Sequence, residues 1–274
     1  MKRHLCFVVL LLFAIQAKAS SLVENIRQHY LPSEYDTLLV GDEDMPVFAA
    51  EPTTPLSRGV ALIFLDNGHQ GLTLHNAQML AMQLNQRGWH TRILPSDTVQ
   101  WNINPLAPSD MTDALHSRAS NTAFKVDFSS SESSLSLWIN AAFDSSANIP
   151  GFRLVIAQGM TGAQLVSLTA KGSIPNADSL VLLDAFWPDK DINAQLTEKI
   201  AQIDIPIIDL HTAHVYQAIS LLSSRQRAVN KTLKLYYRQK TLSGVNPITL
   251  SNSTSALASN LDKEIYGWTR YLGW

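Results

Sequence analysis

From Gly59 onward the chain alternates between short apolar runs and longer segments with helical spacing, and this alternation constrains its fold more than any other feature. Residues 60–65 form a continuous apolar run, as expected for a parallel strand that is covered on both faces. Residues 72–87 carry apolar side chains at helical spacing and are followed by Gly88, a residue that commonly ends helices. Because strands that alternate with helices form parallel sheets through right-handed crossovers, the sequence predicts an α/β fold with a mostly parallel, doubly covered sheet in a single domain.

The same patterns place the other elements along the chain. Predicted strands cover residues 38–40, 46–50, 60–65, 90–94, 152–157, 179–183, 206–210 and 233–237. Predicted helices cover residues 72–87, 135–143, 162–170, 192–203, 214–229 and 256–271, and residues 20–35 are expected to form a leading helix or arm. The charged loop Gly41-Asp42-Glu43-Asp44 predicts a hairpin at the sheet edge. The polar residues 96–134 predict an insertion, either a lid or a surface loop, because such long connections are uncommon inside compact domains.

Residues 154–163 carry the clearest indication of a chemistry. An apolar strand breaks into a turn of small residues and a helix-compatible segment follows, which is the layout of the nucleophile elbow of α/β-hydrolases. Aligned on the elbow pattern, the turn reads Ala157-Gln158-Gly159-Met160-Thr161, with glycine at the nucleophile position. A frame shifted by two residues places Thr161 there, although a β-branched residue tolerates the left-handed nucleophile conformation poorly. The alternative is that Thr161 opens the helix and caps a free backbone N–H.

The turn after the first long strand, Asn67-Gly68-His69-Gln70-Gly71, occupies the place where hydrolases set an oxyanion-hole amide. Glycine lets the backbone approach a ligand closely, and the start of a helix supplies N–H donors. An ordinary strand-to-helix turn with the same glycines is the alternative. Together the two turns provide the candidate ligand-binding residues, which are Gly68, His69, Gln158, Gly159 and Met160.

A hydrolase also needs an acid and a base. Asp184 and Asp209 each follow or lie near the end of a predicted strand, and Asp209 is nearer the usual position of the acid, with turn capping as its alternative. The base is expected in the loop after the last strand, but residues 238–255 contain no histidine. An unorthodox catalytic set would therefore consist of Thr161, Asp209 and His211. His211 and His214 lack a clustered third ligand, so no metal site or cofactor is predicted.

The first 19 residues have the layout of a signal peptide. Lys2 and Arg3 precede an apolar run over residues 5–15, and Ala17-Lys18-Ala19 has the small-x-small form of a cleavage site. The run is shorter than the roughly 20 apolar residues of a membrane span. The sequence predicts cleavage after residue 19, a periplasmic location and a mature domain over residues 20–274.

Cleavage changes the charge and the cysteine content. Of the 21 Lys and Arg residues it removes three, and none of the 23 Asp and Glu residues, so 18 basic residues remain and the formal charge is −5. This acidic balance argues against a nucleic-acid partner, which requires a basic face. The single cysteine, Cys6, is removed as well, so the mature domain must be stable without disulfides.

Four stretches of the chain together resemble a known family. They are residues 65–71 with Gly88-Trp89, residues 158–163, residues 182–188 running to 205–209, and residues 265–268. In order and spacing they are similar to the DUF3530 family of exported bacterial proteins, which is placed with the α/β-hydrolases. The resemblance implies an α/β-hydrolase-like fold, and the activity of the family is unassigned.

Two functions remain open from the sequence. The first is an exported hydrolase homologue without a Ser-His-Asp triad, which acts as a binding or envelope-associated protein for a small-molecule or acyl ligand. The second is an active esterase or other acyl hydrolase that uses Thr161, or a serine of the insertion, with His69, His211 or His214. Protein partners are not indicated by any motif.

Overall fold

The computed structural model describes residues 22–65, 72–95, 128–187, 190–212, 218–242 and 254–274. Within these residues the chain forms one eight-stranded sheet with the strand order β1-β2-β4-β3-β5-β6-β7-β8. The strands are β1 (Asp36–Val40), β2 (Glu43–Ala50), β3 (Gly59–Leu65), β4 (Trp89–Pro95), β5 (Phe152–Gln158), β6 (Ser179–Leu183), β7 (Ile207–Thr212) and β8 (Tyr237–Leu242). The predicted α/β fold with a mostly parallel sheet is confirmed.

Only the first two strands depart from the parallel arrangement. β1 and β2 form an antiparallel hairpin at one edge of the sheet, as the charged residues 41–44 predict. β2 also runs antiparallel to β4. From β4 to β8 every neighbouring pair is parallel. β8 forms the opposite edge.

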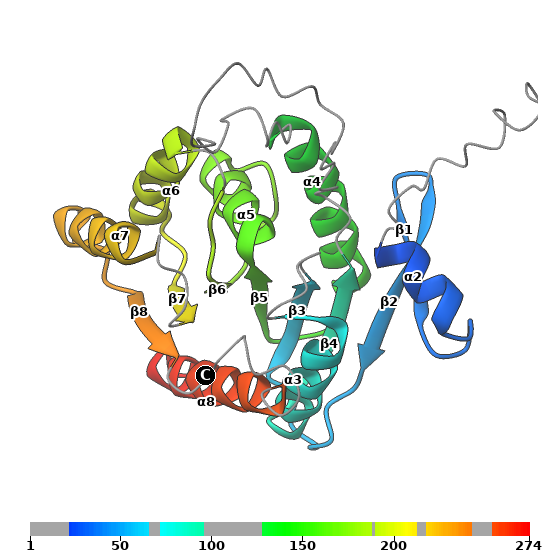
Figure 1. Cartoon of the computed structure of the whole chain (residues 1–274). Coiled ribbons are helices and arrows are strands. Elements are labelled where there is room, and N and C mark those ends of the chain that lie inside the picture. Colours follow the sequence, from blue (N-terminus) through cyan, green and yellow to red (C-terminus); the bar gives the residue numbers. More distant parts are fainter. Residues whose placement is uncertain (1–21, 66–71, 96–127, 188–189, 213–217, 243–253) are drawn as a thin grey trace, which may run out of the picture.

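Helices cover both faces of the sheet (Figure 1). They are α2 (Leu22–His29), α3 (Leu74–Gln86), α4 (Phe128–Ser145), α5 (Gly159–Lys171), α6 (Lys190–Gln202), α7 (Ala218–Thr232) and α8 (Thr254–Tyr271). One core lies between the sheet and α4, α5, α6 and α7, and the second lies between the sheet and α3 and α8. Alternate residues of each strand feed these two cores, since successive strand side chains point to opposite faces. All seven residues of β3 are therefore buried.

Three predicted boundaries are wrong in ways that matter for the site. α4 begins at Phe128, so the last seven residues of the predicted insertion, 128–134, are helical, and the Glu132–Lys171 ion pair of 2.5 Å joins that serine-rich start to α5. α5 begins at Gly159, three residues before the predicted start. The predicted strand over residues 233–237 overlaps β8 only at Tyr237, because α7 continues to Thr232 and a turn follows it. Residues 96–127 of the predicted insertion lie outside the described residues.

In the part of the chain that the structure describes, none of the helices combines the length and the apolar character that crossing a membrane requires.

Candidate functional site

The junction between β5 and α5 has the backbone of a nucleophile elbow. Gln158 ends the strand in an extended conformation and Gly159 starts the helix directly, with a φ of 57°. That left-handed conformation is one that residues with a Cβ adopt at a cost, whereas glycine adopts it freely. The backbone of Gly159 thus has the strained geometry that an elbow requires, and the residue carries no side chain.

Segments that follow β3 and β6 surround this junction. The Oε1 atom of Gln158 accepts a hydrogen bond from the backbone N–H of Leu72. On the other side, the backbone N–H of Phe186 donates to the carbonyl oxygen of Gly159 at 3.1 Å. A Cβ added to Gly162 would lie 3.1 Å from the Cβ of Ala185, so the first turn of α5 packs closely against the segment after β6. The junction is fixed from both sides at the carboxyl edge of the sheet, where open α/β sheets bind ligands.

Met160 and Thr161 follow Gly159 inside the first turn of α5. Each is only 1 % exposed, and Met160 belongs to the core between the sheet and α4 to α7. The prediction that Thr161 opens the helix is wrong, because α5 already starts at Gly159 and Gln158 is its N-cap. Thr161 is therefore an interior helical residue, with a hydroxyl that solvent does not reach.

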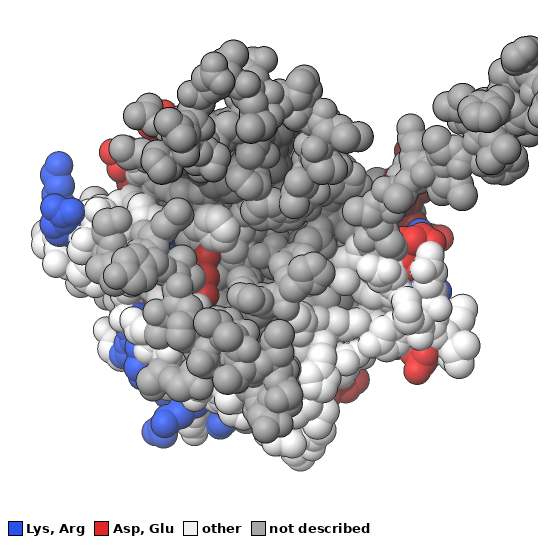
Figure 2. Space-filling model, viewed as in Figure 1, with Lys and Arg blue, Asp and Glu red and all other residues white. Residues whose placement is uncertain are grey.

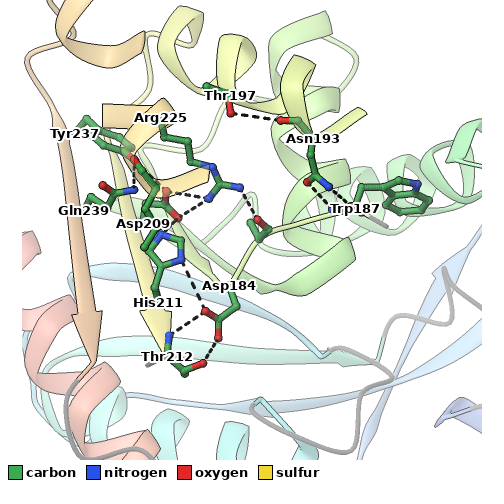
Figure 3. A network of polar contacts seen from close by, with 12 residues as sticks. Asp184, Trp187, Asn193, Thr197, Asp209, His211, Thr212, Arg225, Tyr237 and Gln239 are labelled. Atoms are coloured by element: carbon green, nitrogen blue, oxygen red, sulfur yellow. Dashed lines mark hydrogen bonds and ion pairs between the residues drawn. The ribbon is translucent and has the colours of Figure 1, made fainter. Parts of the chain in front are cut away.

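The second part of the site is a buried polar network at the ends of β6 and β7 (Figure 3). At its centre Asp209, on β7, is completely buried. Arg225 of α7 donates to both of its carboxylate oxygens at 3.2 and 3.0 Å, and the Tyr237 hydroxyl of β8 donates at 2.9 Å. Arg225 also donates to the carbonyl oxygen of Ala185 at 2.5 Å, which ties the segment after β6 to α7.

His211 lies between two carboxylates of this network. Its Nε2 atom is 3.1 Å from Oδ1 of Asp209, although the geometry is not that of an aligned hydrogen bond. Its Nδ1 atom is 3.8 Å from Oδ1 of Asp184. The histidine side chain is 4 % exposed. Asp209 and His211 come together because residues two apart on a strand share a face of the sheet.

Asp184 follows the last residue of β6 and has a left-handed conformation with a φ of 47°. Its two carboxylate oxygens accept hydrogen bonds from the backbone N–H and the hydroxyl of Thr212, at 2.9 and 2.7 Å. Burial raises the pKa of Asp184 above its ordinary value, and the bonds from Thr212 and the nearby His211 act in the opposite direction. These bonds hold the carboxyl group of Asp184 at the carboxyl edge of the sheet, beside the end of β5 that leads into Gly159.

The charge of the Asp209 carboxylate is balanced by that of the Arg225 guanidinium. Burial acts to raise the pKa of Asp209, but Arg225, His211 and Tyr237 outweigh it and hold that pKa at about 2. Burial and the Asp209 carboxylate both raise the pKa of Tyr237, so its hydroxyl stays protonated and remains a donor. A permanently ionised aspartate with an arginine and a tyrosine as fixed partners is suited to holding β7, β8 and α7 together.

The structure places the predicted site residues in different surroundings. It brings Asp209 and His211 together and puts Gln158, Gly159, Met160 and Thr161 at the elbow. Gly68, His69 and His214 lie outside the described residues. Among the residues that the structure describes, no three His, Cys, Asp or Glu side chains group in a way that could hold a metal ion.

Sequence reasoning missed Arg225 and Tyr237. A signal for Arg225 exists, because it falls four residues before the buried Val229 on the face of α7 that packs on the sheet. A charged residue on such a face indicates a buried ion pair, since an unpaired buried charge is too costly to keep. Tyr237 has no comparable signal, because its partner is set by the pairing of β7 with β8.

The strand order, the crossovers and the elbow define the class as proteins of the α/β-hydrolase fold. Solved structures support this assignment at the level of the fold. The esterase domain of a Rhodothermus marinus protein is 12 % identical, with a TM-score of 0.53, and covers 86 % of this chain and 97 % of its own. An α/β serine hydrolase homologue from Coxiella burnetii is 10 % identical, with a TM-score of 0.56, over 89 % of this chain and 99 % of its own. A dienelactone hydrolase from Anabaena variabilis is 12 % identical, with a TM-score of 0.53, over 84 % and 94 %.

Within that class, the family described as "Protein of unknown function (DUF3530)" matches residues 14–270. The chain belongs to the DUF3530 family. No curated protein matches this sequence.

Proposed function

We propose that this protein is an exported, non-catalytic member of the α/β-hydrolase fold that binds a small-molecule or acyl ligand at the carboxyl edge of its sheet. The observation that carries the proposal is Gly159, which occupies the left-handed position of the elbow with a φ of 57° and has no nucleophilic atom. In active members of this fold the nucleophile is the side chain at that position. The turn retains its backbone geometry without the reactive group.

The absence of a suitably placed histidine base also supports a non-catalytic protein. The hydrolase fold takes its catalytic histidine from the loop after the last strand, and the sequence contains no histidine after His214. His211 is on β7, is nearly inaccessible, and has a carboxylate beside each ring nitrogen. Its position stabilises the interior network and leaves it poorly placed to take a proton from a substrate-facing hydroxyl.

The alternative, an active acyl hydrolase that uses Thr161, is disfavoured by the position of that residue. Thr161 is 1 % exposed and lies within the first turn of α5, two residues past the strained position. A nucleophile must reach the carbonyl carbon of a substrate, which a buried hydroxyl on a packed helix does not.

The binding part of the proposal rests on what the elbow retains. A glycine at the tip lets a ligand approach the backbone closely, and the start of a 13-residue helix presents N–H groups to it. In hydrolases the same groups bind the oxygen of an ester carbonyl, so an acyl carbonyl or carboxylate is the ligand chemistry that fits.

The catalytic part is tested with the chain from Ser20 onward, a fluorophosphonate probe and p-nitrophenyl butyrate. We expect neither covalent labelling nor turnover. Labelling that disappears in Thr161→Ala would contradict the proposal and establish the alternative. Gly159→Ser is the sharper variant, because it restores a hydroxyl at the elbow. We expect it to remain unlabelled for want of a base, and labelling would show that a base survives at the site.

The binding part is tested separately by isothermal titration with butyrate and octanoate. Saturable binding of either carboxylate supports an acyl site, and no heat with both contradicts it. Export is tested by mass spectrometry of the protein from periplasmic extracts. A first residue at Ser20 is expected, and an intact N-terminus would overturn the predicted cleavage.

A further inference from the structure

The segment that runs from β7 to α8 is basic without any acidic residue. Between Leu210 and Leu261 the sequence contains no Asp or Glu. It contains six basic residues, Arg225, Arg227, Lys231, Lys234, Arg238 and Lys240. This contrasts with the chain as a whole, in which acidic residues outnumber basic ones by 23 to 21. The positive charge is therefore concentrated on α7 and β8.

The turn from α7 to β8 presents a leucine in an unfavourable backbone conformation. The N–H of Leu233 donates to Asn230 and that of Lys234 to Val229, both at 3.3 Å, which is the hydrogen-bond pattern of a Schellman motif. Leu233 takes the left-handed position of this motif with a φ of 55°, where glycine or asparagine is usual. Its side chain is 80 % exposed, so packing does not explain why leucine is there.

Neighbouring apolar side chains are exposed with it. Leu235 is 81 % exposed, and Tyr236 and Tyr271 are about half exposed with ring centroids 6.4 Å apart. Lys234, between the two leucines, turns inward and donates to the carbonyl oxygens of Ile203 and Ile205. The leucines on either side of it are left in solvent at the amino end of β8.

Basic side chains border this apolar group. Lys231 is exposed, and the Arg238 guanidinium lies 4.8 Å from the centre of the Tyr271 ring. Lys240, farther along β8, pairs with Glu264 at 2.5 Å and is not part of this group. We call the set of Leu233, Leu235, Tyr236 and Tyr271 with Lys231 and Arg238 the α7–β8 surface. Figure 2 shows Lys and Arg side chains gathered over α7 and, lower down, over β8 and α8.

We propose that the α7–β8 surface docks the protein onto an anionic lipid bilayer. Leucine and tyrosine side chains gain free energy in the interfacial layer of a bilayer, and lysine and arginine beside them attract anionic headgroups. Leu233, which neither packing nor backbone conformation favours, and the exposed Leu235 become useful when they enter that layer. The charge of the surface is complementary to the headgroups and opposite to the net charge of the chain.

Docking by this surface leaves the ligand edge free. The turn between α7 and β8 is at the amino end of β8, whereas Gly159 and Asp184 lie at the carboxyl ends of β5 and β6, parallel to it in the same sheet. The two ends of parallel strands face opposite ways. A docked molecule would keep its candidate ligand site away from the bilayer, so this inference is independent of the proposed function.

The test measures the partition of the chain from Ser20 onward onto vesicles by cosedimentation. Vesicles of phosphatidylglycerol with phosphatidylcholine are compared with vesicles of phosphatidylcholine alone, at about 0.05 and 0.5 M salt, where screening differs severalfold. We expect binding to the anionic vesicles that weakens with salt. Lys231→Gln should weaken it about fivefold at low salt. Leu235→Ser should weaken it about tenfold at both salt concentrations, since the apolar contribution is not screened.

Leu137→Ser is the matched control, because Leu137 is 56 % exposed and lies on α4, outside the α7–β8 surface. It should bind like the wild type. Equal binding to both kinds of vesicle, or binding that Leu235→Ser and Lys231→Gln leave unchanged, would overturn the proposal. A second result would also overturn it. If the protein bound no vesicles and formed a dimer in sedimentation velocity that the same two substitutions dissociate, the surface would join two copies of the chain.

Discussion

The ends of β5 and β6 lie side by side in the sheet, where Gln158 pairs with Leu183, and they differ in what they carry. Both strands are followed by a residue in the left-handed region, Gly159 with a φ of 57° and Asp184 with a φ of 47°. At Gly159 the conformation costs little because the residue is glycine. At Asp184 it costs about 1 kcal/mol, and two hydrogen bonds from Thr212 help to hold it.

The difference separates geometry from chemistry. The β5 end has the backbone of a hydrolase elbow and no reactive side chain. The β6 end has the carboxyl group of Asp184, which is 10 % exposed and bonded to Thr212. The nearby His211 and Asp209 side chains are buried. Under the proposed function, this chain would keep the framework of the fold without using it for catalysis.

The largest effect is expected from breaking the network beside the β6 end with Arg225→Met. This substitution leaves the buried Asp209 carboxylate without its guanidinium and frees the Ala185 carbonyl. A buried charge that loses its partner destabilises by about 3–5 kcal/mol. Urea unfolding monitored by circular dichroism measures the loss.

Arg227→Met on the same helix is its control, because Arg227 is exposed and, among the described residues, its bonds go to Ser223 and Ser224 of α7. It should change the free energy of unfolding by less than about 0.5 kcal/mol. Adding Asp209→Asn to Arg225→Met should restore part of the loss, because the unpaired charge disappears. An Arg225→Met protein as stable as the wild type would show that the network does not hold the β6 end.

A smaller loss is expected at the β5 end from Gly159→Ala. The added Cβ must enter the left-handed region, which costs about 1–2 kcal/mol. Gly267→Ala in α8 is the matched control, because Gly267 is helical and a Cβ there would meet nothing within 4 Å. It should stabilise by about 0.5–1 kcal/mol. Thermal unfolding of both variants compares them, and equal shifts of the same sign would refute the strain at Gly159.

The buried strands of this fold were predictable from sequence because their signal is local. β3 is a continuous apolar run and β5 and β6 are mostly apolar, and the predicted bounds agree with the structure within one residue. The start of β8 was not predictable in this way. The stretch from Leu233 to Tyr236 has three apolar or aromatic residues of four, but the Schellman turn after α7 takes Leu233 and Lys234, and β8 starts only at Tyr237.

Some parts of the candidate site were also predictable from the sequence, and others were not. Glycine at the elbow follows from aligning five residues, and the proximity of Asp209 and His211 follows from their spacing on one strand. The partners of Asp209 come from α7 and β8, and only the packing of these elements brings Arg225 and Tyr237 to it. Sequence spacing identifies groups on one element, whereas a network between elements needs the tertiary structure.

Asp184→Asn removes the ionisable group at the β6 end. The free energy of unfolding should change by no more than about 1 kcal/mol. Burial raises the folded pKa of Asp184 above its ordinary value. Ionisation therefore costs the folded state stability, a cost that is absent below the ordinary pKa and complete above the folded pKa. Asparagine can still accept from the Thr212 N–H and has no such cost.

The stability of Asp184→Asn relative to the wild type should consequently rise from about pH 3 to pH 7. Urea unfolding at a series of pH values provides the comparison. Asp178→Asn is the control, because Asp178 is exposed and also accepts a backbone N–H, from Arg153. A relative stability that falls with pH would mean that the carboxylate at the β6 end is favoured when ionised.

The smallest effect is expected at Leu233, which besides Asp184 is the other non-glycine residue in the left-handed region among the described residues. Leu233 extends the comparison of the two strand ends to an exposed turn. Asparagine tolerates this conformation better than leucine, so Leu233→Asn should stabilise by a few tenths to about 1 kcal/mol in thermal unfolding. The same substitution removes an exposed apolar side chain from the α7–β8 surface and should weaken binding to anionic vesicles. A variant that becomes more stable and binds less would show that leucine is kept at this turn for contact and against local stability. If the variant lost stability instead, the Leu233 side chain would stabilise the fold by packing. Leu233 would then not be comparable with Asp184, a residue in a strained conformation that is kept for its side chain.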